Sequence, residues 1–169
     1  MLGFWQLGTT ATAPVPITDG AGSPADPPAN PTYRVYGEGA LMANGTGSLS
    51  KLDTGAVAGA SNASPIVITS AGHGLQTGTR VTVAGVLSNT AANGTFTVSR
   101  IDADRFSLDG SAGNADYTAG GTWHVSGLYQ LALPLNGGDG YEEGKVYHVL
   151  VTYTLSGQSR TVELTLMVV

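Results

Sequence analysis

The sequence predicts an all-β protein, and three observations carry the prediction. Glycine accounts for 25 of the 169 residues and only 11% of the residues are charged, which is typical of turn-rich β proteins. Apolar and polar residues alternate with a period of two in many short segments. No segment shows the apolar spacing of three and four over ten residues that a helix requires. We therefore expect helix only as one or two short turns.

The N-terminal part of the chain contains one predicted strand. Residues 1–7 are apolar but too few for a membrane span, and they lack a positive leader, so we expect neither an export signal nor an anchor. Residues 9–31 are rich in Thr, Ala, Pro, Gly and Asp, which favours an extended arm or a long loop. Residues 32–36 form a β-prone run, and Asn44-Gly45 and Asp53-Thr54-Gly55 then predict turns. A first, modest sheet element is expected here.

The middle of the chain alternates between short strand candidates and turn signals. The predicted strands cover residues 66–69, 80–83, 95–99, 105–108 and 122–125. The dipeptides Asn93-Gly94 and Asp109-Gly110 are typical of hairpin turns. Alternate residues of these strands are apolar, as Phe96 and Val98 illustrate, so each strand is expected to bury one face. This part is therefore predicted to form a compact β module, with Trp123 in its core.

The C-terminal part contains the longest predicted strands. Residues 129–133 alternate before a glycine-rich turn at 136–140. Residues 145–155 alternate over a length that few loops reach, which makes this strand the clearest of all. A turn at 156–159 then leads into the alternating residues 161–169. The C-terminus is therefore expected to be held in a sheet.

The composition argues against several kinds of partner and chemistry. The formal net charge is −5, so no basic surface is available to neutralise phosphates. The chain has no cysteine, which excludes disulfides, thiolate nucleophiles and sulfur-ligated metals. It also lacks the Gly-x-Ser-x-Gly turn of many serine hydrolases. We therefore expect no nucleic-acid or membrane partner, no cofactor and no enzymatic activity.

Histidines are the first candidates for a metal or ligand site. His73 lies between two glycines, a context that could present its imidazole, but a turn within the module explains it better. His124 and His148 occupy alternate strand positions that are expected to face solvent. Three scattered histidines do not have the short ligand spacing of a zinc site. No metal site is therefore predicted.

Acidic residues form two local groups. Asp102, Asp104 and Asp109 could hold a cation, but the spacing lacks the glycine and the distal glutamate of a calcium loop, and hairpin turns explain these residues better. A second group could act as paired carboxylates in glycoside hydrolysis, but it lies in a glycine-rich loop, where a solvated tip is the better interpretation. This group consists of Asp139, Glu142 and Glu143. We predict no catalytic site from either group.

Phe4, Trp5 and Leu7 are the candidate partner-binding residues. A short apolar segment on a flexible Thr/Ala/Pro tether cannot bury three large side chains by itself. Either they dock onto the chain's own sheets, or they dock onto a neighbouring subunit, where aromatic anchors supply much of the binding energy. Both alternatives remain open from the sequence.

Residues 58–123 carry a series of motifs that resembles a known module. The series is SPIVIT at 64–69, GHGL at 72–75, TG at 77–78, ANGTFTV at 92–98, Asp104, FSLDGS at 106–111 and GGTW at 120–123. It resembles a small β-barrel module common in bacteriophage structural proteins, which is often likened to the first catalytic-cysteine half-domain of ubiquitin-activating enzymes. The likeness implies a fold and not an activity, because this chain has no cysteine.

The flanking sequences resemble a second, looser phage pattern. It consists of Leu7-Gly8 followed by a Thr-rich arm, PTYRVY at 31–36, SGLY at 126–129 and GKVY at 144–147. These flanks look like two halves of one immunoglobulin-like β-sandwich with the small barrel inserted in a loop, where insertions are tolerated. The resulting domain prediction is an N-terminal arm at 1–12, a discontinuous sandwich at 13–57 and 125–169, and the inserted barrel at 58–124.

The resemblance implies a structural protein of a phage virion, assembled in the host cytoplasm. The leading expectation is a decoration or cement protein that binds and bridges major capsid subunits, and that forms a homo-oligomer on the particle. A tail, baseplate or head-tail adaptor component fits the same pattern. A third alternative is a host-glycan-binding module, in which tyrosines around the barrel loops form the platform.

Overall fold

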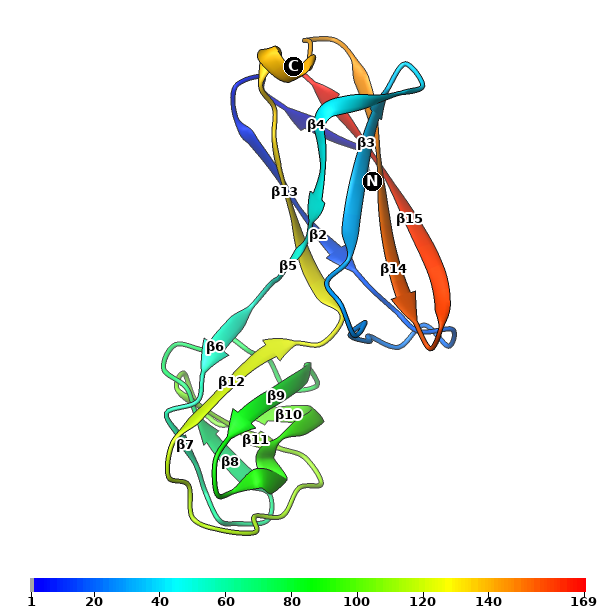
Figure 1. The fold of residues 1–169 in the computed structure, drawn as a ribbon. Coiled ribbons are helices and arrows are strands. Elements are labelled where there is room, and N and C mark those ends of the chain that lie inside the picture. The colour runs from blue at the N-terminus through cyan, green and yellow to red at the C-terminus, as the bar shows by residue number, and fades with distance from the viewer. Residues whose placement is uncertain (1) are drawn as a thin grey trace. The chain divides into compact units, whose positions relative to one another are not determined.

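The computed structural model describes residues 2–169, and for Leu2 and Gly3 the backbone alone. The chain divides into two compact units: residues 1–50 with 127–169, and residues 51–126. We call them the sandwich unit and the barrel unit (Figure 1). Apart from two short 3-10 turns, the regular structure of the described residues is β-strand. The predicted all-β fold class is confirmed.

The sandwich unit consists of a five-stranded and a three-stranded sheet. The five-stranded sheet has the order β1-β15-β14-β3-β4, and the three-stranded sheet has the order β2-β13-β5. Their bounds are β1 (Leu2–Trp5), β2 (Thr10–Pro16), β3 (Thr32–Gly37), β4 (Ala40–Ser48), β5 (Ser50–Lys51), β13 (Leu128–Pro134), β14 (Val146–Leu155) and β15 (Gln158–Val168). All neighbours with a described register pair antiparallel, except that β1 runs parallel to β15.

This strand order is that of an immunoglobulin-like sandwich. Strands β2, β13 and β5 take the places of B, E and D, while β15, β14, β3 and β4 take those of G, F, C and C′. The barrel unit enters the chain between β5 and β13, the D and E positions. Alternate residues of β14 point inward, and they meet inward residues of β2 and β13 in one apolar core.

A buried tyrosine ties the start of β14 to the loop before it. The Tyr147 hydroxyl accepts a hydrogen bond from Glu142 N at 2.8 Å and lies 3.3 Å from Gly140 O, to which it donates. The arrangement matches the tyrosine corner of immunoglobulin-like domains, in which a tyrosine near the start of strand F bonds the upstream backbone. Tyr141 packs against it edge to face, with ring centroids 5.0 Å apart.

The prediction of an N-terminal arm or loop is wrong for the residues that form strands β1 and β2. Strand β1 pairs with β15, and all seven residues of β2 pair with β13. The inward residues of β2 are the small Ala11 and Ala13 together with Val15, so the strand has little of the hydrophobicity that identifies strands in a sequence. Pro14 and Pro16 are tolerated because β2 is an edge strand.

The barrel unit contains one seven-stranded sheet with the order β6-β12-β9-β10-β11-β8-β7. Its elements are β6 (Thr54–Ala56), β7 (Gly59–Ala60), β8 (Ile66–Thr69), β9 (Arg80–Val86), the turn η1 (Thr90–Ala92), β10 (Gly94–Arg100), β11 (Arg105–Leu108) and β12 (Gly120–Val125). The segment between β6 and β7 bonds both ends of the sheet: Val57 N donates to Gly121 O and Ala58 N to Thr69 O. The strands therefore curl around one core, as in a small barrel.

The barrel unit covers residues 51–126 and so extends beyond its predicted boundaries of 58 and 124 at both ends. Residues 54–56, expected in the sandwich, form β6 and pair with β12 of the barrel unit. Val125 N also donates to Asp53 O, which keeps both ends of the barrel unit in its own sheet. No helix among residues 2–169 is long and apolar enough to cross a membrane.

Candidate functional site

The three predicted partner-binding residues divide between solvent and core. Phe4 is 62% exposed, whereas Trp5 and Leu7 are partly buried and pack against the sandwich core. This division follows from the pairing of β1 with β15, because neighbouring strand residues point to opposite faces of the sheet. Only Phe4 of the three therefore presents a large apolar side chain to solvent.

The face of the five-stranded sheet that points away from the core, here called the outer face, carries more apolar side chains. Phe4 lies opposite Met167, and Met167 lies opposite Val146 on its other side. Val146 is 44% exposed and Met167 is half-buried. We call these three residues the Phe4 strip. Such a strip on a sheet face that points away from the core is the kind of feature that binds another protein surface.

A second row of side chains crosses the outer face beside the Phe4 strip. His148 of β14 lies opposite Thr165 of β15 and Tyr36 of β3, and Tyr36 lies opposite Leu41 of β4. Leu41 is 51% exposed. In the sandwich unit, the exposed large apolar side chains of residues 4–50 and 127–169 are Phe4, Leu41, Val146 and Val169. Three of the four therefore gather on the outer face.

One ion pair and one histidine–carboxylate contact border these apolar residues. Lys145 Nζ lies 2.5 Å from Glu38 Oε1, and His148 Nδ1 lies 2.6 Å from Glu163 Oε1. The hydrogen bond and the charge of Lys145 lower the pKa of the Glu38 carboxyl, and Glu38 in turn raises the pKa of Lys145. All four side chains are exposed, so they add little to stability and are free to form the polar rim of an interface.

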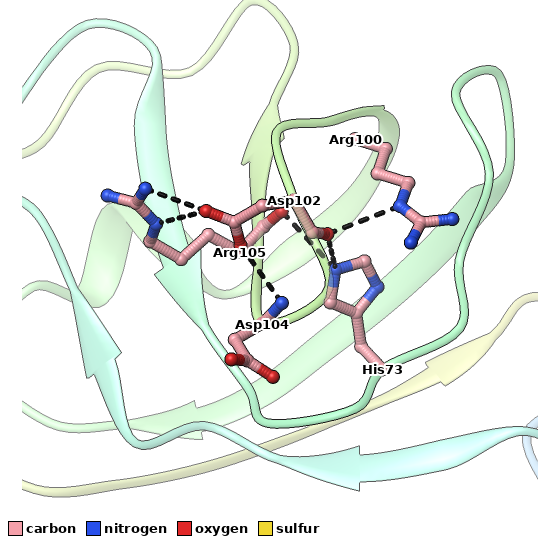
Figure 2. A network of polar contacts seen from close by, with 5 residues as sticks. All are labelled: His73, Arg100, Asp102, Asp104 and Arg105. Atoms are coloured by element: carbon pink, nitrogen blue, oxygen red, sulfur yellow. Dashed lines mark hydrogen bonds and ion pairs between the residues drawn. The ribbon is translucent and has the colours of Figure 1, made fainter.

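His73 of the barrel unit is held by hydrogen bonds to the backbone (Figure 2). Leu75 N donates to Nδ1 at 3.0 Å, so Nε2 carries the proton and faces the carbonyls of Asp102 at 3.0 Å and Arg105 at 3.3 Å. The ring is buried and packs edge to face on Phe106, 5.0 Å between centroids. Both ring nitrogens are engaged with backbone, which leaves neither for a metal.

The acidic loop beside His73 is also held by internal bonds (Figure 2). Arg105 donates twice to Asp102 Oδ2, at 2.7 and 2.9 Å, which lowers the pKa of Asp102. Asp104 N donates to Asp102 Oδ1, and Gly72 N donates to Asp104 Oδ1. These carboxylates fold the loop around His73. No group of three metal-ligating side chains occurs within residues 2–169.

The remaining acidic candidates do not converge on a cleft. Asp139 Oδ1 accepts from Asn44 Nδ2 at 2.8 Å, and Asp139 Oδ2 accepts from Asn136 Nδ2 at 3.1 Å. Glu142 and Glu143 are exposed. Asp139 therefore joins strand β4 to the η2 (Gly137–Asp139) turn, and the three acids do not form a paired-carboxylate site.

Trp123 and Tyr117 of the barrel unit belong to its core or pack against it. Trp123 is buried, and its Nε1 donates to Ser70 Oγ at 2.8 Å. Tyr117 is the one tyrosine in residues 51–126, and its hydroxyl lies 2.9 Å from Val57 O and 3.0 Å from Gly120 O. Neither ring forms the exposed platform that a sugar would stack on.

Replacing His73 by phenylalanine is expected to lower the free energy of unfolding of the barrel unit by about 2 kcal/mol, because Leu75 N and the Asp102 carbonyl lose their partner. Denaturation followed by Trp123 fluorescence in a Trp5→Phe background measures the change. The control His148→Phe, at an exposed site, is expected to stay within about 0.5 kcal/mol. An unchanged midpoint for His73→Phe would show that the histidine is not structural.

No protein-family model matches the chain, and no curated protein matches it. The resemblance to phage modules therefore remains a prediction.

Met167 and Val146, the neighbours of Phe4 on the outer face, were not predicted from the sequence. The alternation within β14 and β15 indicates which of their residues point outward. It does not show that β1 joins the same sheet.

Proposed function

We propose that the chain is a non-enzymatic structural protein of a phage virion, a capsid decoration or cement protein that attaches through the Phe4 strip. The observation that carries the binding role is the 62% exposed Phe4 beside Met167 and the exposed Val146 on the outer face. The phage assignment rests on the sequence resemblance described above. Major capsid subunits are the proposed partner.

The energetics of the Phe4 strip favour a binding role. Burying a large apolar side chain contributes on the order of 2 kcal/mol. The pairing of β1 with β15 already fixes the backbone of Phe4, so docking orders little more than the side chain. Two or three such side chains per subunit, repeated over a lattice, supply substantial attachment energy.

The proposal of a non-enzymatic role is supported by how the candidate reactive groups are used. His73 and Asp102 hold a loop of the barrel unit, and Asp139 holds strand β4 to the η2 turn of the sandwich unit. Each of these groups is engaged by backbone or side-chain partners and not directed into a shared cleft. The surface, and not a reactive centre, is the proposed functional element.

The Phe4→Ser variant is expected to bind undecorated shells of the parent phage about 10-fold more weakly than the native chain, because it removes roughly 1.5 kcal/mol or more of apolar burial. Co-sedimentation with shells across a range of salt concentrations measures the affinity. The control is Leu87→Ser, since Leu87 is 56% exposed in the barrel unit. Equal binding by both variants would remove the Phe4 strip from the contact, and a native chain that does not bind shells would remove the decoration role.

A further inference from the structure

A charged row crosses the outer face beyond His148. Leu150 of β14 lies opposite Glu163 of β15 on one side and opposite Arg34 of β3 on the other. Leu150 is half-buried, and the two charged residues are exposed. The row therefore consists of an acid, an apolar centre and a base, with the two charges about 10 Å apart across two strand spacings.

The base of this row is unpaired. Within residues 2–169, the Arg34 guanidinium has no hydrogen-bond or ion-pair partner, while Glu163 Oε1 lies 2.6 Å from His148 Nδ1. The row is also self-complementary, because the same row on a second copy presents the opposite charge to each charged residue. A two-fold axis that lies in the interface plane along β14 exchanges the β3 side with the β15 side. A second copy placed about this axis presents Glu163 to Arg34, Arg34 to Glu163 and Leu150 to Leu150.

The distribution of charge favours a second copy as the occupant. Of 7 basic and 12 acidic residues, the outer face and its rim carry two basic residues, Arg34 and Lys145, and three acidic residues, Glu38, Glu142 and Glu163. The face therefore sums to 2 − 3 = −1, and the rest of the chain carries 5 − 9 = −4. Two copies with this net charge repel each other least when they approach through these nearly neutral faces.

We propose that the outer face is a homodimer interface, in which two five-stranded sheets pack face to face about a two-fold axis along β14 and form two reciprocal Arg34–Glu163 ion pairs. Sheets packed in this way lie about 10 Å apart with aligned strands. The inference does not depend on the virion role. Val146 lies four residues along β14 from Leu150, about 13 Å, at the end of the sheet. The Phe4 strip lies on the same outer face, so the dimer covers Val146 and Met167, and binding of shells through the strip competes with dimerisation.

Charge reversal tests the proposal. The native chain is expected to sediment as a dimer in analytical ultracentrifugation. Arg34→Glu alone, or Glu163→Arg alone, places like charges together twice and is expected to weaken the dimer by ~100-fold or more. An equimolar mixture of the two variants is expected to form a heterodimer, because every contact across the axis is then again between opposite charges. The double variant R34E/E163R is expected to dimerise by itself.

The control is Arg80→Glu, the same substitution at an exposed strand position of the barrel unit, which is expected to leave the dimer unchanged. Circular dichroism checks that each variant keeps its fold. The proposal is overturned if the native chain sediments as a monomer, if either single variant stays dimeric, or if the mixture of variants stays monomeric. The readout is sedimentation and not shell binding, so failure of the dimer and failure of shell attachment are told apart.

Discussion

Replacing Gly127 by alanine is expected to destabilise the sandwich unit by more than ~3 kcal/mol. Gly127 has a φ of +67°, and a Cβ atom there would lie 2.4 Å from Ile17 O and 2.6 Å from Ala25 N. These are backbone atoms that cannot move aside, because Ile17 N itself donates to Gly127 O and Ala25 N donates to Ile17 O. Hydrogen exchange of sandwich-unit peptides during denaturation measures the loss.

The matched control is Gly157→Ala. Gly157 has a φ of +76° in the turn between β14 and β15, and a Cβ atom there would meet nothing within 4 Å. Only the left-handed backbone conformation then opposes alanine, at a cost of about 1–2 kcal/mol. If both variants lose the same stability, the close approach around Gly127 is not the cause.

Replacing Tyr147 by phenylalanine is expected to destabilise the sandwich unit by about 2 kcal/mol. The change removes the hydroxyl that bonds Glu142 N and Gly140 O and leaves the ring in place. Urea denaturation, read by exchange of sandwich-unit peptides, gives the free energy. A neutral result would contradict the role of Tyr147 as the corner that fixes the start of β14.

Tyr141→Phe is the control for Tyr147→Phe, and it is not expected to lower the free energy of unfolding. Burial raises the pKa of Tyr141 to about 12, and its hydroxyl is buried without a hydrogen-bond partner among the described residues. Removing an unsatisfied buried hydroxyl is expected to be neutral or stabilising by up to about 1 kcal/mol. Since the two rings are in contact, the pair of variants isolates the hydrogen bonds from the packing.

The fold was predictable wherever one face of a strand carries large apolar side chains. In β14, Tyr147, Val149 and Val151 alternate with outward residues, and the structure buries them as the period of two predicts. Strand β2 was missed because its inward side chains include Ala11 and Ala13 and its outward ones include proline. Small side chains fill the space beneath an edge strand without leaving a hydrophobic signal.

The candidate site was predictable only in part. The apolar character of Phe4 indicated that something must cover it, but its neighbours Met167 and Val146 depend on a parallel pairing between the two ends of the chain. Local patterns carry no information on such pairings. The turn around His73 was predicted, whereas the carbonyls it faces come from residues 102 and 105, far along the chain.

We propose a repeated structural subunit of a virion, and the copy number of the chain in purified particles is the quantity that decides this proposal. Quantitative mass spectrometry of virions, purified through a density gradient, compares the chain with the major capsid protein. We expect a copy number comparable to that of the capsid protein. A copy number similar to that of tail or adaptor proteins, or absence from the particle, would contradict it.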